Sequence, residues 1–97
     1  MSATAASLRV DGERLRLSGT LDRAAAAALW PQAVAAVARV RVLDLDLVDA
    51  VDSAGLALLV ALSARIDAPT LHGTPRGLDE LLAAYRLSPT LRFDHAR

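Results

Sequence analysis

One stretch of the sequence, residues 43–66, constrains what this chain can fold into more than any other. Residues 43–47 alternate leucine with aspartate, which is the period of a half-buried strand. From Leu56 onward the residues are mostly apolar over more than the length of a strand and do not alternate, which indicates a helix. Asp52 and Ser53, between these segments, are residue types typical of a helix N-cap. The sequence therefore predicts a strand that passes through a tight turn into a helix.

The start of this predicted helix is where we expect a functional site. The first backbone N–H groups of a helix have no partner within the helix and carry partial positive charge. A small polar side chain at Asp52 or Ser53 is therefore displayed at an electrostatically distinct point.

Length and composition predict one domain, residues 1–97, with an aliphatic core. Hydrophobic residues make up 54% of the chain and aromatic residues only 3%, so leucine, valine and alanine must fill the core. The formal net charge is zero, without the basic excess expected of a nucleic-acid-binding protein. The absence of cysteine excludes disulfides and thiolate zinc sites.

No segment predicts direct insertion into a membrane. Residues 1–7 lack the basic and apolar regions of a signal peptide and are expected to form a flexible terminus. The longest apolar run, residues 56–62, is far too short to cross a bilayer. Any association with a membrane is therefore expected to go through a partner.

The segments before the central strand predict a hairpin and then a helix. Residues 8–10 and 15–17 alternate in polarity around a turn signal. Asp22 is the expected N-cap of an alanine-rich helix that extends to about Arg39. Pro31 lies inside this helix, where it removes a backbone N–H and crowds a carbonyl group, so a kink or break is expected.

A short strand and a last helix are predicted after the central helix. Residues 70–72 form the strand, and Thr74 and Pro75 begin the helix as its cap and first residue. Residues 88–89 end this helix, and residues 91–93 form either an edge strand or an ordered tail. The core face of the last helix is predicted to consist of Leu78, Leu81, Leu82 and Tyr85. The order β-β-α-β-α-β-α implies an α/β fold: a small mixed sheet of four or five strands, covered by about three helices mainly on one face.

The two sides of the predicted central helix differ in side-chain size. The side expected to pack on the sheet carries Leu56, Leu58, Leu59, Val60, Leu62 and Ile66. The opposite side carries Ser53, Ala54, Ala57, Ala61, Ala64 and, at its edge, Arg65. An outward stripe of alanines has two compatible interpretations: good helix propensity in an alanine-rich chain, or a face on which another backbone docks closely.

Four aspartates near the central turn invite a metal-site interpretation. They are Asp44, Asp46, Asp49 and Asp52. A calcium loop needs a glycine-permitted turn and a distal glutamate, whereas leucine, valine or alanine fills every gap here. We therefore expect solvated carboxylates on the strand and in the loop, together with a helix cap, and no bound metal.

Ser53 and His72 invite a hydrolase interpretation, because the strand that ends at His72 is expected near the central strand. The sequence has no strained Gly-x-Ser-x-Gly elbow, and no acid is evident that would orient the histidine. His95 lies in the tail and is expected to be solvated. No catalytic residue, cofactor or small-molecule substrate is therefore expected.

Two motifs resemble those of the STAS domain family, which includes bacterial anti-sigma-factor antagonists and cytoplasmic domains of sulfate transporters. Residues 42–45, Val48 and residues 51–56 resemble the family signature, and residues 17–22, Leu-Ser-Gly-Thr-Leu-Asp, resemble its second landmark. Within the family, the chain is most similar to the small STAS subunits of Mla-type phospholipid-transport ABC complexes. That similarity includes the run at residues 51–59, a Leu-Ser-Pro after a tyrosine-bearing helix, and the short length.

The resemblance implies a non-catalytic binding module. In Mla-type complexes the STAS subunit docks on the cytoplasmic ATPase and supports its assembly and activity. The resemblance therefore implies an ABC transporter ATPase as partner, and a cytoplasmic location held at the inner membrane through that complex. The partner-binding residues that it implies, together with the outward side of the central helix, are Asp52, Ser53, Ala54, Ala57, Ala61, Ala64 and Arg65.

The resemblance also leaves a regulatory alternative open. STAS antagonists of anti-sigma kinases are switched by phosphorylation of the serine directly before the motif glycine. That position is Ala54 here, and only Ser53 offers a hydroxyl as possible phosphoacceptor in this turn. An anti-sigma-factor antagonist, or another STAS regulator that binds such a kinase, is the alternative function.

Overall fold

A computed structural model describes residues 6–67 and 69–87. The elements are β1 Ser7–Asp11, β2 Arg14–Leu21, α1 Arg23–Ala36, the 3-10 turn η1 Val37–Arg39, β3 Val42–Val51, α2 Ser53–Ser63, β4 Thr70–His72 and α3 Leu78–Ala84. The strands form one sheet in the order β1-β2-β3-β4, with β1 and β2 antiparallel and the other neighbours parallel. The predicted α/β class, mixed sheet and element order are confirmed, and β1 begins within the segment expected to be a flexible terminus.

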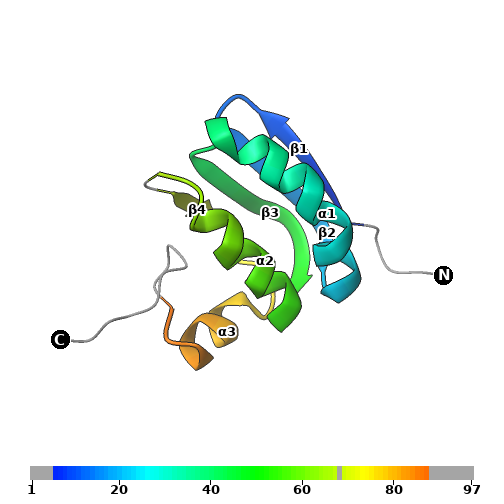
Figure 1. The fold of residues 1–97 in the computed structure, drawn as a ribbon. Coiled ribbons are helices and arrows are strands. Elements are labelled where there is room, and N and C mark those ends of the chain that lie inside the picture. The colour runs from blue at the N-terminus through cyan, green and yellow to red at the C-terminus, as the bar shows by residue number, and fades with distance from the viewer. Residues whose placement is uncertain (1–5, 68, 88–97) are drawn as a thin grey trace.

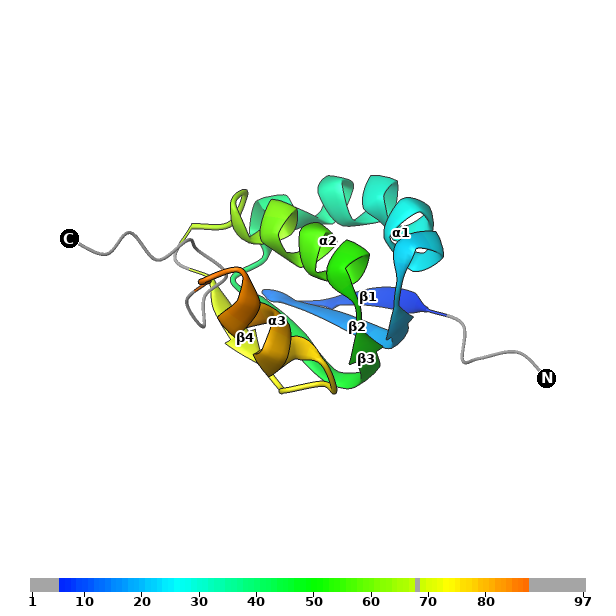
Figure 2. The same ribbon diagram turned by 90° about the horizontal axis from the view of Figure 1, so that it is seen from below.

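The hydrophobic core lies between the sheet and the helices α1 and α2, which cover one face of it (Figures 1 and 2). Leu15, Leu17 and Leu21 of β2 point to this face and are fully buried, because successive strand residues alternate between the two faces. The buried residues of α1 are Ala25, Leu29 and Ala33. Small side chains at two of these positions let α1 lie close to the sheet.

β3 departs from strict alternation, and this changes which of its side chains are buried. Arg16 of β2 pairs with Asp44, but Ser18 pairs with Leu47, so β3 carries an extra residue between these pairs, as in a β-bulge. The bulge reverses the phase of the strand and turns Leu47 outward, where it is 56% exposed. Val48 takes the inward position instead. The inward position that simple alternation predicts for Leu47 is therefore wrong.

α1 runs as predicted except at Pro31. Asp22 caps the helix, since its carboxylate accepts the backbone N–H of Ala25 at 2.9 Å. The helix is continuous through Pro31, so the predicted break is wrong, whereas the alternative of a kink stays a prediction. Pro31 and Ala27, whose carbonyl loses its usual partner, both lie on the exposed side of α1, where water can hydrogen-bond that carbonyl. The turn η1 then extends the helical path to Arg39, its predicted end.

α3 begins later than the sequence predicts. Its N-cap is Gly77, with φ of 90°, and Thr74 and Pro75 precede the helix. The chain before Gly77 extends the sheet edge instead: Arg76 bridges to β3, and its carbonyl accepts the N–H of Val51 at 3.0 Å. A Cβ at position 77 would lie 2.6 Å from the carbonyl oxygen of Val51. Left-handed backbone and close approach together place the helix start at this glycine.

α3 packs beside α2 (Figures 1 and 2). Its predicted core leucines are buried or partly buried, but Tyr85, at the C-cap, is 49% exposed. The predicted core position of Tyr85 is therefore wrong. α3 ends at Ala84, so the predicted helix end at residues 88–89 is wrong. The candidate strand at residues 91–93 lies outside the described part of the chain.

The helices are short. The longest described helix, α1, has 14 residues, and no helix in the described part of the chain is long and apolar enough to cross a membrane.

Candidate functional site

Two hydrogen bonds of Asp52 hold the turn between β3 and α2, one made by its carboxylate and one by its backbone N–H. The Asp52 carboxylate accepts the N–H of Gly55 at 2.9 Å, which caps α2. The N–H of Asp52 donates to the carbonyl of Leu21, at the end of β2, at 3.2 Å. The predicted N-cap is thus Asp52, and Ser53 is the first helical residue. These two bonds fix the start of α2 against the end of β2.

Gly55 lets the first turn of α2 pass directly over the end of β2. It is buried, and a Cβ added to it would overlap the carbonyl oxygen of Leu21 and lie 2.8 Å from the carbonyl carbon. Real Cβ atoms do not approach backbone this closely, so the position has no room for a side chain. The motif glycine is therefore a packing requirement of the β3–α2 junction.

The outward side of α2 carries small side chains. Ser53, Ala57 and Ala64 are exposed, and Ala54 and Ala61 are half-buried. The large side chains of α2 lie on the opposite side, where Leu56, Leu58, Leu59 and Leu62 are buried. The structure thus places the predicted alanine side outward, and leaves the helix backbone accessible to a close neighbour.

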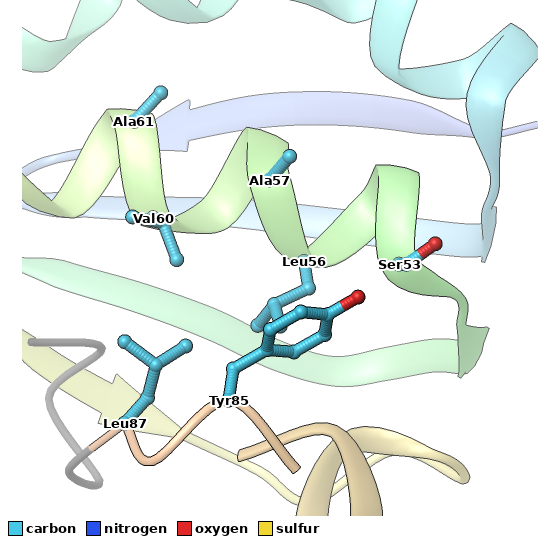
Figure 3. Close-up of a pocket in the computed structure, with 7 residues that line it drawn as sticks. All are labelled: Ser53, Leu56, Ala57, Val60, Ala61, Tyr85 and Leu87. Carbon is cyan, nitrogen blue, oxygen red and sulfur yellow. The ribbon is translucent and has the colours of Figure 1, made fainter. Parts of the chain in front are cut away.

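A hollow of about 360 Å³ lies between α2 and the chain that follows α3 (Figure 3). It is lined by Ser53, Leu56, Ala57, Val60, Ala61, Tyr85 and Leu87. The ring of Tyr85 lies across from Leu56, and its hydroxyl is directed toward the end of α2 that carries Ser53. Apart from the two hydroxyl groups, the lining side chains are hydrocarbon. This hollow can receive an apolar side chain and offers hydroxyls at one end.

Sequence reasoning missed four residues of this hollow. Leu56 and Val60 were expected to pack on the sheet, and Tyr85 and Leu87 reach the hollow only because α3 returns the chain to α2. The helical spacing of Tyr85 pointed to the core instead, so the local pattern held no signal for its position at the hollow.

Arg65 turns toward α1 and away from this hollow. Its guanidinium lies 5.0 Å from the centroid of the Trp30 ring, a cation–π distance, and donates to the carbonyl of Ala61 at 3.1 Å. Ala54 also faces α1. The predicted partner-binding residues are therefore divided between the two flanks of α2.

Asp44 is a buried carboxylate in the sheet, although solvation was expected. Its side chain is 1% exposed. One oxygen accepts hydrogen bonds from Arg14 at 2.9 Å and Arg16 at 3.2 Å, and the other accepts the N–H of Asp46 at 3.0 Å. Burial alone would raise the pKa of Asp44, but the hydrogen bonds from Asp46, Arg14 and Arg16 outweigh it and lower the pKa from 3.8 to about 2. The ionised carboxylate therefore holds the backbone of the β3 bulge.

His72 joins Asp44 and Asp46 at this end of the sheet. Its Nδ1 lies 3.1 Å from a carboxylate oxygen of Asp46 and 3.7 Å from one of Asp44. One ligand atom from each residue lies within 4.8 Å of the others, a spacing that could hold a metal ion. The carboxylate of Asp44 already accepts hydrogen bonds from two arginines, and the imidazole of His72 contacts Asp46, so these contacts account for the group. The other two aspartates lie away from this group. Asp49 is exposed within β3 rather than in the predicted loop, and Asp52 caps α2.

Ser53 and His72 lie toward opposite ends of the sheet. His72 pairs with Asp44 where β4 runs beside β3. Ser53 comes just after the end of β3 at Val51, and Val51 lies seven residues beyond Asp44. At about 3.3 Å per residue, that separation is roughly 20 Å. The arrangement therefore does not support a Ser–His hydrolase.

The fold and the motif-bearing turn define the class of this protein. A hairpin leads into parallel strands joined by helices, and the Asp-Ser-Ala-Gly turn lies between β3 and α2, as expected of a STAS domain. The sequence matches the family described as "Mlab, STAS domain" over residues 4–92, nearly the whole chain. The chain belongs to this family. No curated protein matches it.

Proposed function

We propose that this chain is the non-catalytic STAS subunit that binds and supports the ATPase subunit of a Mla-type phospholipid-transporting ABC complex. Membership of the MlaB-type family supports the proposal. The observation that carries it is the apolar hollow beside α2, which adjoins the motif turn. Such a subunit works in the cytoplasm and is held at the inner membrane by the ATPase.

The hollow has the chemistry of a protein-docking surface. Side chains with an apolar body and a polar tip, such as Tyr85, are enriched at protein interfaces. Ala57 and Ala61 let a partner backbone approach α2 closely, while the hollow accepts a larger apolar side chain. Among the described residues, the lining offers hydroxyls but no carboxylate, imidazole or amine, which favours binding over acid–base catalysis.

A STAS regulator that binds an anti-sigma kinase is the second candidate, and exposure of Ser53 is the observation that favours it. Phosphate on Ser53 would add about two negative charges at the edge of the hollow. The position before Gly55 is Ala54, which has no hydroxyl to accept phosphate. Intact-mass measurement after incubation with candidate kinases tests this alternative, which requires phosphate mapped to Ser53.

The test of the proposed function is direct binding to an identified partner. The protein is first captured with its partners from native lysate, and mass spectrometry identifies them. The captured ABC ATPase is then purified and titrated with the STAS protein by calorimetry. We expect saturable binding to the ATPase and none to a sensor-type kinase; the reverse result would replace the proposed function with the regulatory one.

A further inference from the structure

A second hollow lies on the other flank of α2, between α2 and α1. Its volume is about 340 Å³, and it is lined by Ala26, Ala27, Trp30, Ala54, Ala57, Leu58 and Ala61. We refer to these seven residues as the α1–α2 valley. Ala57 and Ala61 also line the hollow beside Tyr85, so the two hollows meet across a low ridge of alanines. A partner seated on Ala57 would reach both.

The α1–α2 valley has a hydrocarbon and indole lining but is bracketed by two arginines. Arg23 shares one stripe of α1 with the valley residues Ala26, Ala27 and Trp30, at the helical spacing i, i+3, i+4 and i+7. Just beyond the end of α2, Arg65 follows Ala61 by four residues and stacks on the Trp30 ring at 5.0 Å. Both arginines are exposed, and neither forms an ion pair with a carboxylate of the described residues. The valley therefore combines an apolar floor with two positive charges that no carboxylate of the described residues pairs.

These features identify the kind of surface that would complement the valley. An arginine stacked on an aromatic ring retains guanidinium donors that match a carboxylate in bidentate geometry. Tryptophan and arginine are also the side chains that most often dominate binding energy at interfaces. The eleven residues of α2 span about 16 Å, which matches roughly three turns of a helix laid along them.

We propose that the α1–α2 valley binds an amphipathic helix of the ATPase subunit, with its apolar stripe on the alanines and its acidic residues at Arg23 and Arg65. This inference rests on the proposed function and extends the docking surface from α2 to α1. Trp30 is covered in the complex, and the two arginines select an acidic partner helix over a neutral one.

Trp30 reports on this contact directly, because it is the only tryptophan of the chain. The protein is labelled with 5-fluorotryptophan and titrated with unlabelled ATPase, and the single fluorine resonance is followed together with its exposure to solvent. We expect the resonance to shift and its solvent exposure to fall as the complex forms. Binding by calorimetry without any change at Trp30 would overturn the inference and leave the proposed function standing. No binding at all would contradict the proposed function itself.

Charge reversal tests the two arginines. We expect Arg23→Glu and Arg65→Glu each to weaken ATPase binding at least tenfold at low salt and to reduce its salt dependence, because each replaces an attraction with a repulsion. Arg9→Glu, an equal charge change at an exposed position on β1, is the matched control and should bind within twofold of wild type. Melting curves confirm that all variants fold. Equal affinities for the three variants would overturn the inference.

Discussion

The inward and outward sides of α2 belong to the same eleven residues but are constrained in different ways. The inward side is fixed by contact: Gly55 touches the backbone of Leu21, and Leu59 and Leu62 are fully buried. The outward side is defined by small size, since Ala57 and Ala61 leave hollows on both flanks. The comparison teaches that the part of the motif formed by the cap and the glycine is a packing device. The outward positions, which the fold does not constrain, are those that we propose contact the partner.

Gly55→Ala changes the inward side of α2 and should have the largest effect on stability. The added Cβ overlaps the carbonyl of Leu21, and neither backbone segment can move without disturbing the core. We expect a loss of about 3 kcal/mol or more in the free energy of unfolding, at the upper end of overpacking effects. Urea denaturation measures it. Ala57→Ser, which adds one heavy atom to the exposed side of the same helix, should cost no more than about 0.5 kcal/mol. Similar losses for the two variants would refute the contrast between the sides.

Asp52→Ala removes the carboxylate that caps the start of α2. We expect a loss of about 1 kcal/mol in the free energy of unfolding, because the N–H of Gly55 loses its carboxylate acceptor. Asp49→Ala, an exposed aspartate in β3, serves as control and should change stability by less than about 0.5 kcal/mol. Chemical denaturation of both variants at neutral pH provides the comparison, and an unchanged midpoint for Asp52→Ala would show that the cap contributes little.

Asp44 provides a test at the end of β3 opposite the start of α2. Its pKa is lower in the folded protein, about 2, than the ordinary value of 3.8, so as pH falls the unfolded chain takes up the proton first. The stabilisation is therefore complete above about pH 4 and is lost between about pH 4 and pH 2. Because the paired arginine side chains are 38% and 40% exposed, we expect a contribution on the order of 1 kcal/mol.

Stability measured against pH for wild type and Asp44→Asn isolates this contribution. The wild-type curve should fall more steeply than the variant curve between about pH 4 and pH 2, because asparagine does not titrate. Parallel curves in that window would mean that another carboxylate controls acid unfolding.

Local sequence signals predicted the elements whose cause is local. Asp22 and Asp52 cap α1 and α2 as expected, because a cap needs only a short side chain at the helix start. The outcome at Pro31 depended on which side of α1 it faces, and the start of α3 depended on the approach of Gly77 to β3. Both are tertiary facts that a helical pattern does not contain.

In the sheet and the hollows, too, the sequence predicted some features and not others. Alternation predicted β3 but not its bulge, which depends on the Asp44 carboxylate accepting the N–H of Asp46. The outward alanines of α2 were readable from helical spacing, whereas Tyr85 and Trp30 come to the same surface from other elements. Two of the seven residues that line the hollow beside Tyr85, and three of the seven in the α1–α2 valley, come from outside α2, and only the folded chain brings them there.

Changes on the outward side should have the smallest effect on stability and still impair binding. Ser53→Ala removes a hydroxyl that does not cap α2, so its stability should be close to that of wild type. If that hydroxyl bonds to the partner, ATPase binding should weaken by about 0.5–1.5 kcal/mol. Calorimetric titration measures the change, and an unchanged affinity would remove Ser53 from the contact.

The most direct measurement of the central claim is titration of the ATPase subunit with Ala57→Arg, which places a long charged side chain on the ridge between the hollows. We expect melting curves to give a free energy of unfolding within about 0.5 kcal/mol of wild type, because Ala57 is exposed. We expect at least tenfold weaker binding, roughly 1.4 kcal/mol, because the arginine holds the two backbones apart and loses water in the contact. If Ala57→Arg binds the ATPase as tightly as wild type, the outward side of α2 is not the docking surface, and its alanines serve only the helix.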